Sequence, residues 1–206
     1  IGGIYRPTEG QILIDGQPVY ENPAIKSKIL YVSDDLYFLP QSNMVKMSRL
    51  YQAAYPDFSY ERFYNLVETF GLDPNANINT FSKGMKRQAT TILALSTMPS
   101  FLFFDETFDG LDPVMRDQFK RVLSQETIDR GLITVLAGHN QQEMEDICDS
   151  VGFLHEGKLV CSGDLDTLLG DVHRVQLIPA GEVSDEEFGA FSPLRLQRQG
   201  RLCMMT

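Results

Sequence analysis

The sequence has few cysteines and no long apolar run. Its 206 residues include three cysteines, Cys148, Cys161 and Cys203, which are widely spaced and form no Cys-x-x-Cys motif. This pattern is typical of reduced thiols in a cytosolic protein, and it argues against a disulfide framework or a cysteine metal site. No apolar stretch approaches the roughly 20 residues that a membrane-spanning helix needs. The chain also begins at Ile1 without an initiator methionine or a signal-peptide pattern, so we expect a piece of a longer protein.

Basic side chains are scarce as well. The chain has 18 Lys and Arg against 28 Asp and Glu, a formal net charge of −10. Such a balance repels a phosphate backbone and predicts no nucleic-acid partner. Any phosphate that is bound must be met locally, by backbone amides, a few basic side chains or Mg²⁺. Hydrophobic residues make up 43% of the chain, without a sustained heptad, which excludes disorder and coiled coil and fits one globular domain.

Strand and helix patterns alternate along the chain, which predicts an α/β domain with a parallel sheet. Apolar runs without alternation, typical of strands buried on both faces, lie at Phe101–Phe104 and at Leu132–Ala137. Two further strands are expected at Gln11–Gly16 and Ile29–Val32. The expected helices are a pair from about Met44 that stops at Gly71, one capped by Ser82, one from Pro113 and one over Gln141–Asp149. Towards the end of the chain we expect a hairpin over Val151–Cys161 that turns at Glu156-Gly157, and β-rich pieces at Val172–Ile178 and Leu194–Leu202.

Polar residues follow both apolar runs. Asp105 and Glu106 come directly after the first, and His139 follows the second. Ligands of open α/β sheets bind at the carboxyl ends of the strands, so all three are expected at one edge. One acid could hold Mg²⁺ through water, the other could orient an attacking water, and the imidazole could donate to a phosphate oxygen. The alternatives are a helix N-cap pair and an ordinary strand-end histidine.

Ser82-Lys83-Gly84 opens a helix, and a small hydroxyl residue with glycine lets backbone N–H groups approach an anion closely. A plain N-cap explains the same residues. The order of motifs decides between the two: this segment precedes the acid-tipped strand, then comes Gly110-Leu111-Asp112, and finally His139.

With these motifs the chain resembles the nucleotide-binding domain of ATP-binding cassette (ABC) transporters, a P-loop NTPase-like fold, from Ile1 to about Leu169. Phe81 through Met85 is similar to the signature loop in its Ser-Lys-Gly-Met version, found in bacterial export-type ATPases. Phe101 through Asp105 is similar to the Walker B strand, and Gly110 through Asp112 to the D-loop.

The resemblance implies ATP and Mg²⁺ as cofactors and a dimer that sandwiches two ATP molecules. It implies that Asp105 helps to hold Mg²⁺, that Glu106 polarises the attacking water and that His139 contacts the γ-phosphate. Nucleotide contacts are expected from Ser82, Lys83, Gly84, Asp112 and Asp34, with Ser82 and Gly84 serving the nucleotide of the opposite subunit.

Two departures from the family pattern stand out. Asp34 occupies the register of the Q-loop glutamine, and its shorter reach changes the usual coupling geometry; Gln41 lies seven positions further on. The chain also has no Walker A loop, because Gly152 to Lys158 is followed by Leu159 and spans a strand–turn–strand pattern. Since residues 1–10 resemble the segment after the Walker A helix, we expect that loop upstream of Ile1 and weak or absent ATP binding by this piece alone.

These features predict an ABC ATPase domain at residues 1–169, with a helical signature subdomain at about 44–98, and a small β-rich extension at 170–206. The leading hypothesis is the ATP-hydrolysing subunit of an exporter, at the cytoplasmic face of the cell membrane. Its partners would be an integral-membrane permease subunit and a second ABC ATPase subunit. The alternatives are a soluble ABC ATPase outside transport and a non-catalytic cassette.

Overall fold

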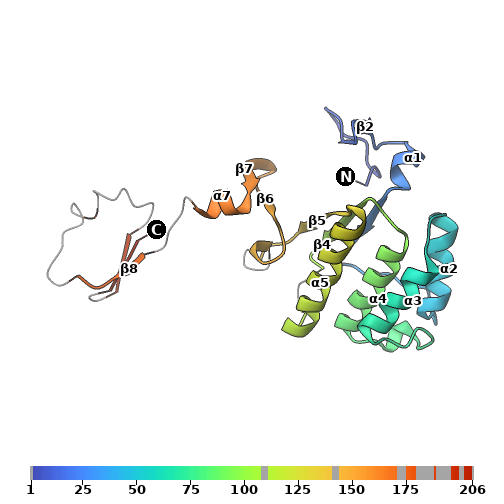
Figure 1. Ribbon diagram of the computed structural model, residues 1–206. Coiled ribbons are helices and arrows are strands. Elements are labelled where there is room, and N and C mark those ends of the chain that lie inside the picture. The colour runs from blue at the N-terminus through green and yellow to red at the C-terminus, as the bar shows by residue number, and fades with distance from the viewer. Residues whose placement is uncertain are drawn as a thin grey trace. The chain divides into compact units, whose positions relative to one another are not determined.

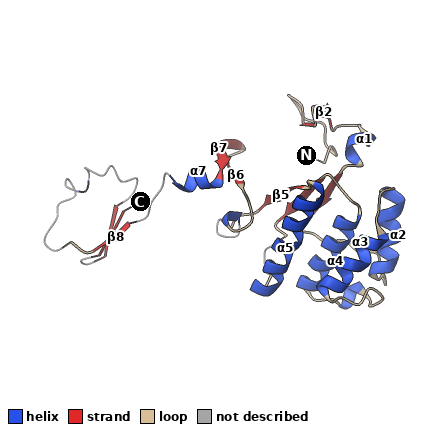
Figure 2. Cartoon of the chain, in the orientation of Figure 1, coloured by secondary structure: helices blue, strands red, loops and turns tan. Residues whose placement is uncertain are grey.

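The computed structural model describes residues 2–107, 111–140, 144–170, 175–179, 188, 196–199 and 202–205. The chain divides into two compact units, Ile1–Gln141 and Gln142–Thr206. Figure 1 follows the elements along the chain, and Figure 2 marks the helices and strands. Within the described residues no helix is both long and apolar enough to cross a bilayer. The functional boundary expected near residue 170 stays a prediction.

A parallel sheet organises the first unit. Its strands β3 (Ile29–Val32), β4 (Phe101–Asp105) and β5 (Ile133–Ala137) lie in the order β3-β4-β5. The central strand β4 is paired on both sides, and Leu102, Phe103 and Phe104 are buried, as its apolar run predicts. The α/β class predicted from the alternation of elements is therefore confirmed.

The strand β5 corrects one expectation. Its apolar run predicts burial on both faces, but Ile133 and Val135 are 51% and 41% exposed. Exposed and half-buried residues alternate along β5, so one face of this strand has no cover among the described residues. The apolar run predicts the strand correctly, but it does not determine whether other elements cover both faces of that strand.

Four helices of the first unit lie side by side in Figure 1: α2 (Met44–Ala54), α3 (Tyr60–Phe70), α4 (Lys83–Ser96) and α5 (Pro113–Arg130). The helix α4 packs against α2, α3 and β3, and it is buried from Arg87 to Ser96. The expected helix ends are confirmed: Ser82 caps α4, Pro113 begins α5, and Gly71 ends α3 at a positive φ of 66°.

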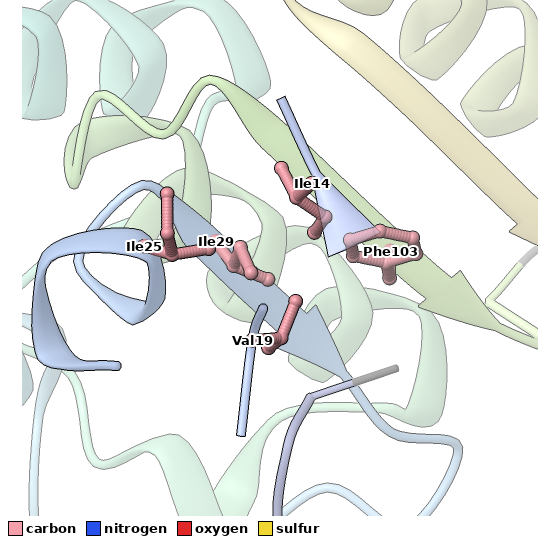
Figure 3. Packing of buried hydrophobic residues seen from close by; sticks show 5 residues of the cluster. All are labelled: Ile14, Val19, Ile25, Ile29 and Phe103. Carbon is pink, nitrogen blue, oxygen red and sulfur yellow. The ribbon is translucent and has the colours of Figure 1, made fainter. Parts of the chain in front are cut away.

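An apolar cluster joins β3 and β4 to the first residues of the chain, where the strand expected over Gln11–Gly16 is shorter than predicted. It forms a two-residue strand, β1 (Leu13–Ile14), paired with β2 (Gln17–Pro18) and followed by α1 (Pro23–Lys26). The buried members of the cluster are shown in Figure 3: Ile14, Val19, Ile25, Ile29 and Phe103.

A buried carboxylate joins α3 to α5. The Glu126 side chain on α5 is 3% exposed, and its Oε1 accepts a hydrogen bond from Arg62 Nε on α3 at 2.5 Å. Its Oε2 pairs with Arg130, which also donates to the carbonyl of Pro99. The rings of Phe70 and Phe119 meet edge to face at 5.4 Å between the same two helices. The helical pair is thereby fixed to the strand–helix part of the unit.

The second unit contains the expected hairpin, β6 (Ser150–His155) with β7 (Lys158–Asp164), and it turns at Glu156-Gly157 with both residues at positive φ. A short helix α7 (Leu165–Gly170) and the antiparallel strands β8 (Val175–Leu177), β9 (Leu196–Gln199) and β10 (Leu202–Met205) follow, in the order β8-β10-β9. Of the helix expected over Gln141–Asp149, residues 141–143 lie outside the described residues, Met144 and Glu145 are helical and a turn follows. His173 also lies outside them.

Candidate active site

The parallel register brings three strand ends to one edge of the sheet. Val32 of β3 pairs with Phe104 of β4, and Asp105 of β4 pairs with Ala137 of β5. The residues that follow these strands are Asp34, Glu106 and His139. Asp105 ends β4 itself, so the two acids and the histidine expected at one edge, Asp105, Glu106 and His139, lie there together, while their chemical roles stay predictions.

Glu106 and His139 face each other across this edge. His139 Nδ1 lies 3.4 Å from Glu106 Oε1, close enough for an ion pair when the imidazole is protonated. The Glu106 backbone has a positive φ of 47° and donates its N–H to the carbonyl of Ala137 at 2.9 Å. A left-handed conformation at a residue with a side chain costs about 1–3 kcal/mol and is retained where the surroundings impose it.

Asp105 has a partner that the sequence analysis missed. The Tyr31 hydroxyl of β3 donates to Asp105 Oδ2 at 2.7 Å. The hydrogen bond to this carboxylate, then burial and the negative charge of Asp105, raise the pKa of Tyr31 above its ordinary value. The available signal was the pairing of neighbouring strands, since Tyr31 lies opposite Phe103, two residues before Asp105.

The Tyr31 phenol should therefore keep its proton to a higher pH than an exposed tyrosine. We expect Asp105→Asn to move the pKa of Tyr31 back toward its ordinary value, because the amide carries no negative charge. Carbon-13 NMR of labelled tyrosine rings, with Tyr31→Phe for assignment, measures this directly. A Tyr31 pKa that is the same in both proteins would contradict the contact.

Asp34 is expected from the sequence to contact nucleotide, and it has a protein partner that the sequence analysis also missed. Its Oδ1 accepts from Arg87 Nη2 of α4 at 2.7 Å. The same guanidinium donates from Nη1 to the carbonyl of Glu106 at 2.7 Å. Helical periodicity places Arg87 away from the apolar stripe of Met85, Ala89 and Ile92, so it carried no signal of burial.

The start of α4 carries the predicted anion-binding residues. Ser82 Oγ accepts from the N–H of Met85 at 3.2 Å, which is N-cap geometry, and Ser82 and Lys83 are exposed. A side chain at Gly84 would place a Cβ 2.9 Å from Met115 Sδ of α5, so Gly84 lies close against that helix. The structure therefore gives Ser82 the capping role, and the nucleotide role of these three residues stays a prediction.

Asp112 caps α5, where its Oδ1 accepts from the N–H of Met115 at 2.9 Å. The preceding residues 108–110 of the predicted D-loop lie outside the described residues. A nucleotide contact of Asp112 stays a prediction as well.

The donor set at the strand ends fits magnesium. No cluster of three metal-binding side chains occurs among the residues that the structure describes. Mg²⁺ in phosphoryl-transfer sites needs no such cage, because it binds one or two carboxylates and takes its other ligands from water and phosphate. Asp105 supplies one hard oxygen donor at the end of β4, where such a phosphate would lie.

The fold is that of the ATP-binding subunits of ABC transporters. A solved structure titled "Structure of ATP binding subunit of ABC transporter" matches with a TM-score of 0.74 and 25% identity, over 83% of this chain and 73% of that one. A family model described as ABC transporter matches residues 1–109, more than half of the sequence. The chain belongs to the ABC transporter family.

Similar proteins come from Bacillus subtilis (strain 168). The ABC transporter ATP-binding protein YtrB is 24% identical over 168 residues, which cover 82% of this chain and 58% of YtrB. The linearmycin resistance ATP-binding protein LnrL is 28% identical over 191 residues, which cover 88% of this chain and 61% of LnrL. The chain thus spans about three-fifths of the length of these two relatives.

Proposed function

We propose that this chain is part of the ATP-hydrolysing subunit of an ABC transporter, and that the edge formed by Asp34, Asp105, Glu106 and His139 is its hydrolytic site. The observation that carries the proposal is the meeting of Glu106 and His139, 3.4 Å apart, beside Asp105 at the end of a buried strand. Phosphoryl transfer needs positioning and electrostatic stabilisation more than covalent chemistry, and these groups supply both.

Three of these side chains, Asp105, Glu106 and His139, have distinct tasks in this proposal. Asp105 helps to hold Mg²⁺, which neutralises charge that develops on the phosphate oxygens. The Glu106 carboxylate accepts a hydrogen bond from the attacking water and orients it in line with the γ-phosphorus. His139 donates a hydrogen bond to a γ-phosphate oxygen. Its contact with Glu106 keeps the imidazole and the carboxylate next to the same γ-phosphate.

The rest of the assembly follows from the family. Ser82, Lys83 and Gly84 contact the nucleotide bound by a second ABC ATPase subunit, which is either a copy of this chain or a related one, and Asp112 lies at the dimer interface. An integral-membrane permease subunit docks at the helical subdomain, which places the protein at the cytoplasmic face of the membrane. The resistance role in the name of LnrL supports export as the direction of transport.

A histidine exchange tests the proposal. In the complete protein, we expect His139→Ala to lower the rate of ATP hydrolysis about 100-fold, because it removes one donor to the γ-phosphate. His155→Ala is the matched control, since His155 is an exposed histidine at the end of β6. Phosphate release at saturating MgATP gives both rates. Equal rates of hydrolysis in the two variants would show that His139 has no role in the hydrolytic site.

A further inference from the structure

Arg87 is a buried cation that ties three parts of the first unit together. It lies in the second turn of α4 and is 1% exposed. Its guanidinium reaches Asp34 after β3 and the Glu106 carbonyl after β4, both at 2.7 Å. A charge so deeply buried is costly unless it is paired and hydrogen-bonded, so these two contacts determine where the guanidinium can lie.

The Glu106 backbone is held from both sides by these contacts. Its N–H donates to Ala137 of β5, and its carbonyl accepts from Arg87. Its left-handed φ of 47° is unfavourable for glutamate and needs such restraint. The backbone conformation determines the direction in which the Glu106 side chain leaves the chain, so a shift of the Arg87 guanidinium is expected to move the carboxylate relative to His139.

Asp34 supplies the negative charge that balances Arg87 and one of the two acceptors that orient its guanidinium. Its side chain is 53% exposed, whereas the arginine that it binds is almost fully buried. The pair therefore extends from the loop after β3, which solvent or a bound molecule can reach, to the backbone of Glu106. Asparagine at this position would retain an oxygen acceptor but lose the negative charge that balances Arg87.

We propose that Arg87 is a positioning residue that holds Glu106 in its hydrolytic orientation and that depends on Asp34 to do so. This inference rests on the proposed ATP hydrolysis for its effect on turnover, but its structural part does not. Arginine is needed because its planar fork spans two acceptors, whereas the single ammonium of lysine cannot donate in the same two directions.

The first test measures the Glu106 backbone without any nucleotide. In the complete protein, Arg87→Lys should speed amide hydrogen exchange at Glu106 about tenfold, because one hydrogen bond that restrains this residue is lost. Arg121→Lys is the control, since Arg121 and Asp117 form an exposed ion pair with the same 2.7 Å separation. Unchanged exchange at Glu106 in Arg87→Lys would overturn the inference whether or not the protein hydrolyses ATP.

The second test measures turnover. We expect Arg87→Lys to lower kcat up to about 100-fold with little change in the KM for MgATP, because a displaced group slows the chemical step more than binding. Asp34→Asn should lower kcat about tenfold, and the double variant should be no slower than Arg87→Lys, since both changes act through one contact. The matched pair Arg121→Lys and Asp117→Asn should retain the parent kcat.

The outcomes separate the two proposals. A parent protein that hydrolyses ATP while Arg87→Lys retains its kcat contradicts the positioning role. Additive losses of kcat, or losses that follow a fall in Tm, would also contradict it, because they indicate a general structural effect. A parent that does not hydrolyse ATP, with faster Glu106 exchange in Arg87→Lys, would contradict the proposed function and leave the positioning role supported.

Discussion

Replacing Glu106 with glutamine should lower the rate of ATP hydrolysis by the complete protein about 1,000-fold. Glutamine has nearly the same size but no negative charge, so it cannot accept the proton of an attacking water or pair with His139, which lies 3.4 Å from the carboxylate. Binding of MgATP should be unchanged, and the ATP-bound dimer should accumulate because the step that opens it is blocked. Phosphate release, equilibrium ATP binding and size-exclusion chromatography with ATP measure these three results.

Glu68→Gln is the matched control for this exchange. Glu68 lies exposed on α3, so the same chemical change there should leave the rate of hydrolysis within about twofold of the parent. Hydrolysis at the parent rate by Glu106→Gln would show that the Glu106 carboxylate has no role in the chemical step. Loss of ATP binding in the same variant would instead assign Glu106 a role in binding nucleotide.

The largest expected effect on stability is at Glu126. Glu126→Gln keeps the size of the side chain but leaves Arg62 and Arg130 without their buried negative partner. Breaking a buried ion pair on one side costs about 3–5 kcal/mol, and the partial exposure of the two arginines places the expected loss near the lower end, about 3 kcal/mol. For a chain of this size that corresponds to a fall in Tm of about 10 °C, which calorimetry measures.

Asp129→Asn provides the comparison on the same helix. Asp129 is exposed, and its Oδ1 accepts from Gln125 on its own helix at 2.7 Å. We expect its loss of charge to change the free energy of unfolding by less than about 0.5 kcal/mol. Equal destabilisation by the two variants would mean that the Glu126 contacts contribute no more than a surface charge does.

The sequence predicted the elements that depend on local pattern. The unbroken apolar run at Phe101–Phe104 identified the central strand, and its position in a parallel sheet placed Asp105 and Glu106 at the edge where His139 also lies. Capping chemistry at Ser82 and the stop at Gly71 gave helix ends within a residue. Such patterns can be identified from the sequence because each depends on residues that are close together in the chain.

Contacts between distant residues could not be predicted in this way. Tyr31 and Asp105 are 74 residues apart, and Asp34 and Arg87 are 53 residues apart. Periodicity placed Arg87 on the polar side of α4, but the helix is covered on all sides from Arg87 to Ser96. An apolar stripe on one side of a helix does not reveal that the helix will be surrounded by other elements. The burial of Arg87 and its contacts with Asp34 and Glu106 follow from those surroundings.

The central claim is that ATP is hydrolysed where the three strand ends meet. A structure of the complete protein carrying Glu106→Gln, solved with MgATP, tests it most directly. We expect the γ-phosphate within hydrogen-bond distance of His139, with Mg²⁺ beside Asp105 and the amide of residue 106 facing the attacking water. A nucleotide bound away from this edge, with His139 and Asp105 in contact with neither phosphate nor metal, would contradict it.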